Sequence, residues 1–265
     1  KGQKSSRWSS AKSTRKVRLL MSLPNRTLVI GDIHGGLKAL QQVWSRAHIS
    51  KEDTLVFLGD YVDGWSDAVE VISFLISISK THQCIFLRGN HDYLVHRYLT
   101  KNDTNPLWVA HGGAATIAGY KNVSPAEKNE HISFLESLHN YYIDPQNRLF
   151  VHAGFTNQAG PKQEFYPDFV YWDRSLWEMA CSLDPLLSKK SNRYPKRLLL
   201  FKEIYIGHTP TTKIGKTIPT SFANLWNIDT GAAFKGSLSV LDVSTKEFWQ
   251  SDPVYRLYPQ EKGRN

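Results

Sequence analysis

The sequence is poor in cysteine and has no long hydrophobic run. Cys84 and Cys181 are its two cysteines, and their separation matches neither a disulfide framework nor a zinc-thiolate motif. We therefore expect two buried free thiols. No apolar stretch approaches the roughly 20 residues that a membrane-spanning helix needs. Together these absences favour a protein of the reducing cytoplasm and argue against a membrane partner.

The body of the chain also lacks an excess of either charge. The formal net charge is +9, but residues 1–20 hold seven Lys/Arg and no acidic residue. Subtracting these seven from 33 leaves 26 basic residues against 24 acidic ones, a balance of +2. So small a balance gives no indication of nucleic-acid binding, and no specific nucleic acid is expected as a partner.

The basic segment at residues 1–24 is interpreted as a disordered tail. Its composition, rich in Ser and Arg and without acidic residues, predicts little structure of its own. We favour a tail without function over a targeting or phosphate-binding role, which the same charge would also allow. Met21, just before the first apolar run, is a candidate for the natural start.

Five short apolar runs end beside residues that can bind metal ions. The junctions read GDIHG at 31–35, GDYVDG at 59–64, GNHD at 89–92, HAG at 152–154 and GHTP at 207–210. Continuous Val/Ile/Leu runs are typical of buried strands, and open α/β sheets bind ligands beyond the carboxyl ends of their strands. The pattern therefore predicts a metal site, of a hydrolytic kind, at one sheet edge.

The number of candidate ligands indicates two metal ions. The expected ligands are Asp32 and His34 for one ion, Asn90, His152 and His208 for the other, and Asp60 as a bridge. Carboxylate, amide oxygen and imidazole without thiolate favour Mn, Fe or Zn. Paired ions can activate a bridging water and hold both oxygens of an in-line phosphoryl displacement.

Two further residues of these motifs suit proton transfer. His91 directly follows a candidate ligand, which places its ring toward the substrate side as a general acid. Asp63 could hold the other nitrogen of this imidazole and stabilise its protonated form.

The remaining pattern predicts how the elements alternate. Helices are expected over 37–47 and from 66 to 76, with Ser66 as N-cap, so that the first three strands are parallel. Residues 106–145 look helical, with a capping box at 124–127. An aromatic-rich insertion at about 155–200 is expected to be a lid or binding loop. Strands at 203–206, 225–229 and 238–243 are expected to build a second sheet.

This set of motifs resembles the calcineurin-like metallophosphoesterases. The resemblance is to the branch that contains the Ser/Thr phosphoprotein phosphatases and the symmetrical dinucleoside tetraphosphate hydrolases. It implies an α/β fold, with two mixed β-sheets packed as a sandwich and flanked by helices, in one domain over residues 25–260. It also implies two transition-metal ions, Mn first and Fe or Zn as alternatives, on the six ligands already given, with His91 and Asp63 as the acid pair.

The chain departs from the family pattern on the substrate side. The family has Asp-Arg-Gly where this chain has Asp63-Gly64-Trp65, so an arginine that binds the substrate phosphate is missing. The family also ends its third motif in Glu, which pairs with that arginine, and here the residue is Asp92. Arg174 matches a second phosphate-binding arginine of bacterial members and is the expected replacement, whereas His111 is expected to be structural.

The function implied is hydrolysis of phosphomonoesters by attack of metal-bound hydroxide, as in Ser/Thr protein phosphatases. The expected partner is therefore a phosphorylated protein or a small phosphorylated or nucleotide substrate. Symmetrical hydrolysis of diadenosine tetraphosphate is the alternative, favoured by the missing arginine and the aromatic insertion. A metal-binding regulatory module without turnover is an alternative of another class, disfavoured because every ligand and the acid pair are present.

Overall fold

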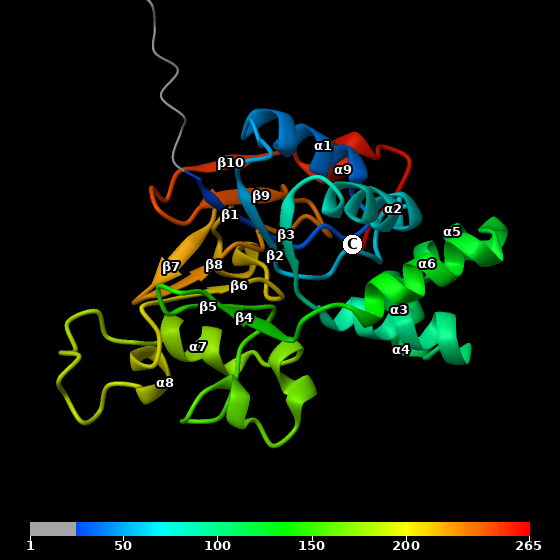
Figure 1. The fold of residues 1–265 in the computed structure, drawn as a ribbon. Coiled ribbons are helices and arrows are strands. Elements are labelled where there is room, and N and C mark those ends of the chain that lie inside the picture. Colours follow the sequence, from blue (N-terminus) through cyan, green and yellow to red (C-terminus); the bar gives the residue numbers. More distant parts are fainter. Residues whose placement is uncertain (1–24) are drawn as a thin grey trace, which may run out of the picture.

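The computed structural model describes residues 25–265. The expectations about a basic tail at residues 1–24 therefore lie outside the described residues. Two five-stranded sheets pack face to face, and helices cover their outer faces (Figure 1). The predicted α/β class, with two mixed sheets, is confirmed.

The first sheet has the strand order β10-β9-β1-β2-β3. Its strands are β1 (Thr27–Ile30), β2 (Thr54–Phe57), β3 (Gln83–Phe86), β9 (Ser239–Asp242) and β10 (Phe248–Gln250). β1, β2 and β3 are parallel and are joined through α1 (Leu37–Arg46) and α2 (Ala68–Ser79), whereas β9 is antiparallel to β1 and to β10. The short helix α9 (Val254–Leu257) follows β10 and packs beside α1.

The second sheet has the strand order β4-β5-β6-β8-β7. Its strands are β4 (Tyr141–Ile143), β5 (Arg148–Val151), β6 (Glu203–Ile206), β7 (Thr220–Phe222) and β8 (Leu225–Asn227). β5, β6 and β8 are parallel, and the edge strands β4 and β7 are antiparallel to their neighbours. Helices α7 (Ser175–Cys181) and α8 (Lys196–Leu199) pack on its outer face.

A helical segment connects the two sheets. It contains α3 (Asn90–Lys101), α4 (Pro106–Trp108), a π turn (Val109–Gly113), α5 (Ala114–Gly119), a 3₁₀ turn (Tyr120–Asn122) and α6 (Pro125–Glu136). Further 3₁₀ turns lie at Pro161–Gln163, Pro167–Tyr171 and Thr211–Ile214.

Strand alternation sorts the apolar residues into three clusters. In β1, Leu28 and Ile30 face the helices, whereas Val29 faces the other sheet. In β5, Leu149 and Val151 likewise face the outer helices, and Phe150 faces inward. The cluster between the sheets consists of Val29, Val56, Leu58, Leu87, Phe150, Tyr205, Ile228, Leu241 and Val243. Because strands such as β1 and β5 are buried on both faces, the sequence shows continuous apolar runs there rather than alternation.

The C-terminal strands correct one expectation. Residues 238–243 form a strand as predicted, but β9 pairs with β1 and so returns to the first sheet rather than the second. A strand that is buried on both faces carries no pattern that identifies its neighbour, so its sheet could not be read locally.

Two local predictions also need correction, and a third is confirmed in part. The helical segment ends at Glu136, and Tyr141–Ile143 form β4 instead. Asp67, not Ser66, precedes α2 as its N-cap residue, because the Ser66 hydroxyl donates to Glu261. Ser124 does cap α6 by accepting from the Glu127 backbone N–H at 3.2 Å, which is one half of the predicted capping box.

The cysteines differ in part from the sequence prediction. Cys84 and Cys181 are both free, as predicted, but they are only partly buried, so the prediction that they are buried is wrong. Of the helices in residues 25–265, none combines the length and hydrophobicity that a membrane crossing requires.

Replacing Phe150 with alanine should lower the free energy of unfolding by about 3–5 kcal/mol, because it leaves a cavity between the sheets. The ring is fully buried and stacks on Tyr205, with centroids 5.0 Å apart. Urea unfolding followed by circular dichroism measures the loss.

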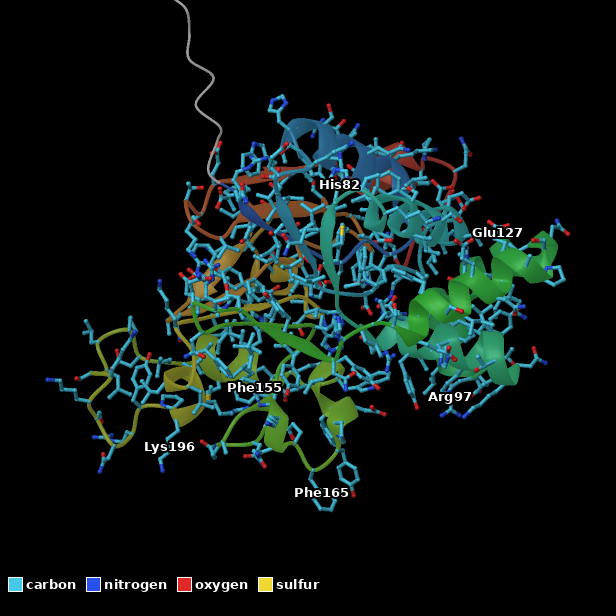
Figure 2. The ribbon with its side chains drawn as sticks, viewed as in Figure 1. His82, Arg97, Glu127, Phe155, Phe165 and Lys196 are labelled. Carbon is cyan, nitrogen blue, oxygen red and sulfur yellow. The ribbon has the colours of Figure 1, made fainter. Side chains whose placement is uncertain are left out.

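Phe165→Ala is the matched control for this experiment. Phe165 is 84 % exposed and extends from the outer edge of the molecule (Figure 2). Its removal should change the free energy of unfolding by no more than about 0.5 kcal/mol. Equal losses for the two variants would contradict a core between the sheets.

Candidate metal centre

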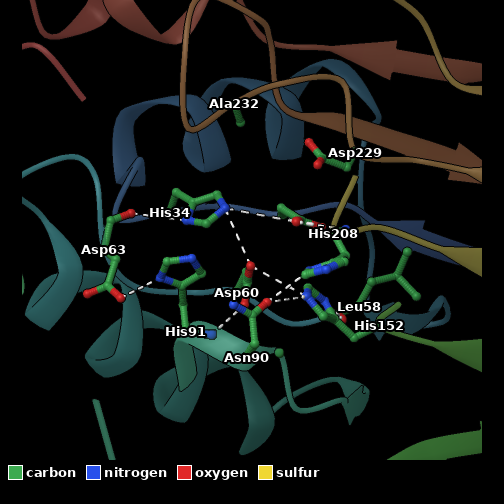
Figure 3. Close-up of polar contacts among 12 residues, drawn as sticks. His34, Leu58, Asp60, Asp63, Asn90, His91, His152, His208, Asp229 and Ala232 are labelled. Carbon is green, nitrogen blue, oxygen red and sulfur yellow. Dashed lines mark hydrogen bonds and ion pairs between the residues drawn. The ribbon is translucent and has the colours of Figure 1, made fainter. Parts of the chain in front are cut away.

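The six predicted ligands lie together where the two sheets meet (Figure 3). They follow β1, β2, β3, β5 and β6, and all are buried except the partly buried His208. Their positions are Asp32, His34, Asp60, Asn90, His152 and His208. Parallel strands deliver the residues at their carboxyl ends to one edge, which explains why segments far apart in sequence converge.

Asp60 lies at the centre of this cluster. Its Oδ2 is 3.6 Å from His34 Nε2 and 3.4 Å from His152 Nε2. Two groups of residues share it, Asp32 and His34 on one side and His152 and His208 on the other. In each group the ligand atoms all lie within 4.8 Å of one another.

The Asn90 side chain joins the second group. Its Oδ1 lies 3.2 Å from His152 Nε2 and 2.9 Å from His208 Nδ1. Asn90 is the first residue of α3, so the helix start directs an amide oxygen toward two imidazoles. The arrangement divides the six residues as the sequence predicted, with Asp60 common to both groups.

The site fits bound cations. Asp32 Oδ1 and His208 Nε2 are buried without a hydrogen-bond partner among the described residues. A buried polar atom without a partner costs about 1–3 kcal/mol, and a cation next to the cluster would supply the missing interaction. The donor atoms are carboxylate and amide oxygens with imidazole nitrogens, a set suited to first-row transition metals.

Charge at the site is concentrated on Asp60 and His152. Burial alone would raise the pKa of Asp60, but His152, His91 and His34 outweigh burial and hold it well below its usual range. Burial opposes the protonated form of His152, yet the Asp60 carboxylate raises the pKa of His152 to about 9. The metal-free centre therefore contains a carboxylate paired with an imidazolium at neutral pH.

Burial dominates at the other ligands. It raises the pKa of Asp32 well above its usual range, and the Asp229 carboxylate adds to this effect. It lowers the pKa values of His34 and His208 well below the usual range, so both imidazoles are neutral. Neutral imidazoles are the form that binds metal.

Several site residues have a strained backbone. The φ angles are 52° at His34, 53° at Asp60, 69° at Asp63 and 67° at His208. Non-glycine residues rarely adopt this left-handed region, and such conformations concentrate at functional sites. The turns after β1, β2 and β6 thus place their site residues through backbone conformations that are rare for non-glycine residues.

Asp63 and His91 form the predicted pair. His91 Nδ1 is 2.6 Å from Asp63 Oδ2, and both residues are buried. Trp108 Nε1–H donates to the same oxygen at 2.5 Å, and the Thr116 hydroxyl donates to Asp63 Oδ1 at 2.6 Å. Each Asp63 oxygen is therefore held in place by a donor from the segment at 108–116.

Sequence reasoning missed Trp108 and Thr116. They are the first and last residues of the Trp-Val-Ala-His-Gly-Gly-Ala-Ala-Thr segment, which is the one signal that could have indicated them. Gly113 makes room for the Trp108 ring, because a Cβ at this position would lie 2.5 Å from the indole. His111, expected to be structural, is exposed and lines the hollow beside His91 instead.

Asp92 stabilises the Asp60 turn. Its carboxylate accepts from the backbone N–H groups of Gly89 and Asp60, each at 2.8 Å, and of Tyr61 at 2.9 Å. Asp92, which stands where the family has Glu, thus holds the backbone of Asp60 in place.

A hollow of about 280 Å³ opens beside His91. Asn90, Trp172 and Arg174 line it, and so does Arg264, which sequence reasoning also missed. Arg174 reaches it from the turn before α7, and its Nη1 donates to the Thr209 hydroxyl at 3.4 Å. The predicted phosphate-binding arginine therefore does lie at the mouth of the cluster.

The affinity of the metal-free protein for Mn²⁺ should rise about tenfold per pH unit between about pH 6.5 and 8, because the ion must displace a proton from His152. Protons are bound below the His152 pKa of about 9 and compete with the metal. Calorimetric titrations in buffers of different ionisation enthalpy measure both the affinity and the protons released. An affinity independent of pH would contradict a protonated His152.

Comparison with known proteins agrees with this geometry. A family model described as calcineurin-like phosphoesterase matches residues 25–222. The asymmetrical bis(5′-nucleosyl)-tetraphosphatase PrpE of Bacillus velezensis is 31 % identical over 229 residues, which cover 80 % of this chain and 86 % of that protein.

Two solved structures share the fold. A protein provisionally described as a diadenosine tetraphosphatase superposes with a TM-score of 0.60 at 16 % identity, over 86 % of this chain and 94 % of that one. A protein serine/threonine phosphatase from Saccharomyces cerevisiae superposes with a TM-score of 0.53 at 15 % identity, over 87 % and 81 %. Since the family model spans most of the chain and its motifs meet in one centre, the protein belongs to the calcineurin-like phosphoesterases and is a phosphoric ester hydrolase.

Proposed function

We propose that this protein hydrolyses phosphomonoesters, in the manner of a Ser/Thr protein phosphatase, at a centre that holds two transition-metal ions. The observation that carries the proposal is the single buried carboxylate, Asp60, shared by two ligand groups. Asp32 and His34 would hold one ion and Asn90, His152 and His208 the other. Mn is the first choice of metal, with Fe or Zn as alternatives. When bound, such ions supply Lewis acidity toward the phosphoryl oxygens and lower the pKa of water.

The protein contributes the proton for the leaving group. His91 lines the hollow and uses Nδ1 for Asp63, so Nε2 is the nitrogen available to a substrate. We assign His91 as the general acid and Asp63 as the residue that fixes its orientation and stabilises its charge. Trp108 and Thr116 in turn position Asp63.

The size and charge of the hollow support a phosphomonoester as substrate. Its volume of about 280 Å³ is at the small end for ligand sites, enough for a phosphoryl group and the side chain that bears it. Arg174 presents a guanidinium there, whose fork geometry matches phosphate oxygens. A phosphorylated protein or a small phosphorylated molecule could present such a group.

The second candidate is hydrolysis of diadenosine tetraphosphate, for which the sequence resemblance implied symmetrical cleavage, whereas the PrpE relative is described as asymmetrical. That relative acts on a bis(5′-nucleosyl) tetraphosphate by its description. Next to the hollow, Tyr166, Phe169 and Trp172 line a second cavity of about 310 Å³, and all three are substantially exposed. Trp172 lines both cavities. A base could stack here while the phosphate chain extends to the centre.

The proposal also includes a cytoplasmic location and a single domain. Two free thiols support a reducing, cytoplasmic location. The predicted domain at 25–260 is supported by the continuous packing of both sheets. The residues after 260 extend it, because Gly263 packs against the Trp65 indole.

His91→Ala should lower kcat by about 10²–10⁴-fold, because the leaving oxygen loses its proton donor. The Mn²⁺ content should stay unchanged, since His91 is not among the proposed ligands. Steady-state kinetics on a phosphoserine peptide and metal analysis of the same sample measure both.

His96→Ala is the control, because His96 lies on the same helix and is partly exposed near Glu136. It should retain full activity. Unchanged turnover in His91→Ala would contradict the acid assignment. A wild-type protein that binds Mn²⁺ but hydrolyses no phosphoester would instead support the silent regulatory module.

Trp172→Ala separates the two substrate classes. If the dinucleotide is the substrate, loss of stacking should raise its KM by about tenfold or more. The KM of a phosphoserine peptide should rise less, because the peptide uses only the hollow and not the second cavity that Trp172 also lines. Comparing kcat/KM for diadenosine tetraphosphate and the peptide, with Phe165→Ala as the exposed aromatic control, decides between them. A wild-type preference for the dinucleotide would overturn the phosphomonoester proposal.

A further inference from the structure

Arg264 reaches the proposed centre from the far end of the described chain. Its Nη1 lies 3.5 Å from His34 Nε2, and its side chain lines the same hollow as His91 and Arg174. No sequence motif indicated it, because it stands 200 residues after Gly64 (264 − 64).

Trp65 anchors the segment that carries Arg264. The indole is fully buried, stacks on Tyr258 with centroids 5.3 Å apart, and donates from Nε1 to the Ala232 carbonyl at 2.7 Å. Gly263 lies against the same ring, where a Cβ would come within 2.7 Å of it. Gly263 also has a φ of +59°, so the chain turns toward the site one residue before Arg264.

Polar contacts fix the same segment to the start of α2. Glu261 accepts from the Ser66 backbone N–H at 2.9 Å and from the Ser66 hydroxyl at 2.7 Å. The Tyr258 hydroxyl donates to Asp67 Oδ2 at 2.5 Å. The Arg264 backbone N–H donates to the Ala233 carbonyl at 2.9 Å. These hydrogen bonds fix the position of Arg264 relative to the site.

Two glycines make room for the arginine stem. A Cβ at Gly64 would lie 3.4 Å from Arg264 Cγ, and a Cβ at Gly112 would lie 3.0 Å from it. Gly64 has a φ of +113°, which side chains other than glycine rarely adopt. The turn at Gly64 thus disfavours an arginine of its own and accommodates the stem of Arg264 instead.

The guanidinium of Arg264 forms no ion pair with a carboxylate of the described residues. None of the ion pairs among residues 25–265 includes Arg264, and its Nε is buried without a hydrogen-bond partner there. The group lies over the Phe234 ring, 5.3 Å from the centroid, beside an imidazole. The Arg264 guanidinium is half-buried, has donors available and lies next to the proposed metal ions. An anion such as phosphate could bind the guanidinium and the ions together.

We propose that Arg264 binds the substrate phosphoryl group together with Arg174, in the place where the resemblance led us to expect an arginine at position 64. The inference rests on the proposed phosphoesterase function and adds a phosphate-binding residue to it. Trp65 and Tyr258 act as positioning residues, because they hold the segment that presents the guanidinium.

The test is the binding of inorganic phosphate, the reaction product, to the Mn-loaded protein, measured by calorimetry. Arg264→Ala should weaken phosphate binding by about tenfold, the contribution of hydrogen bonds to a charged group. Arg264→Lys should retain part of the affinity, since the charge stays but the fork geometry is lost. Arg256→Ala is the control, an exposed arginine on α9 of the same segment, and should bind phosphate as the wild type does.

Two further measurements make the outcome specific. The affinity of each variant for Mn²⁺ should equal that of the wild type, and in kinetics KM should rise while kcat changes little. Wild-type phosphate affinity in Arg264→Ala would overturn the inference, and so would loss of Mn²⁺ binding, which would make Arg264 a support for the metal ligands. If Arg264→Ala fails to fold by its thermal transition, the comparison of Arg264→Lys with Arg256→Ala decides, and equal affinities overturn the inference.

Failure of the proposed function has a different signature. It would appear as a wild-type protein that turns over no phosphoester, whatever the phosphate affinities of the variants.

Discussion

The buried carboxylate of Asp60 is the constraint on which the rest of the site depends. It lies in the turn after β2, within ion-pair distance of His34 and His152. Its other oxygen accepts the His91 backbone N–H at 2.9 Å. A buried charge is tolerated only where partners compensate its lost hydration. The imidazoles and the backbone N–H at the start of α3 fulfil this requirement. Asp92 has a different part, because it holds the turn by accepting from the backbone N–H groups of Gly89, Asp60 and Tyr61.

This constraint explains the unusual backbone around the centre. His34, Asp60 and His208 all adopt left-handed φ angles, a conformation that costs of order 1–3 kcal/mol per residue. Glycines allow the carboxylates to approach the main chain closely, because a Cβ at Gly89 or Gly207 would collide with an Asp60 or Asp32 oxygen. The strain is held by strands that are paired on both sides and buried on both faces. The two sheets therefore hold the strained turns at the site in a conformation that these turns would not keep by themselves.

The substrate side is assembled from more distant parts of the chain. Asp63 is held by Trp108 and Thr116 from the helical connection between the sheets. The hollow next to His91 receives Arg174 from the turn before α7 and Arg264 from the segment packed on Trp65. The exposed aromatic residues around Trp172 extend from the same rim, outside the buried cluster. A protein with the same two sheets and buried cluster, but with different residues around the hollow, could hydrolyse different phosphate esters by one reaction.

The sequence by itself determined the strands that precede the candidate metal ligands, and the division of these six residues about Asp60. It could do so because ligand and strand are adjacent in the chain, and parallel strands bring their carboxyl ends to one edge. The Asp63–His91 pair followed for the same reason, since both residues belong to those ends. Only the tertiary structure decided the partners of β9, the donors on Asp63 and the arrival of Arg264. These contacts join residues that are far apart in sequence, and they depend on burial, side-chain stacking and backbone turns that leave no local periodicity. The candidate ligands are adjacent to their strands in the sequence, whereas the hollow beside His91 forms only when distant segments of the chain fold together.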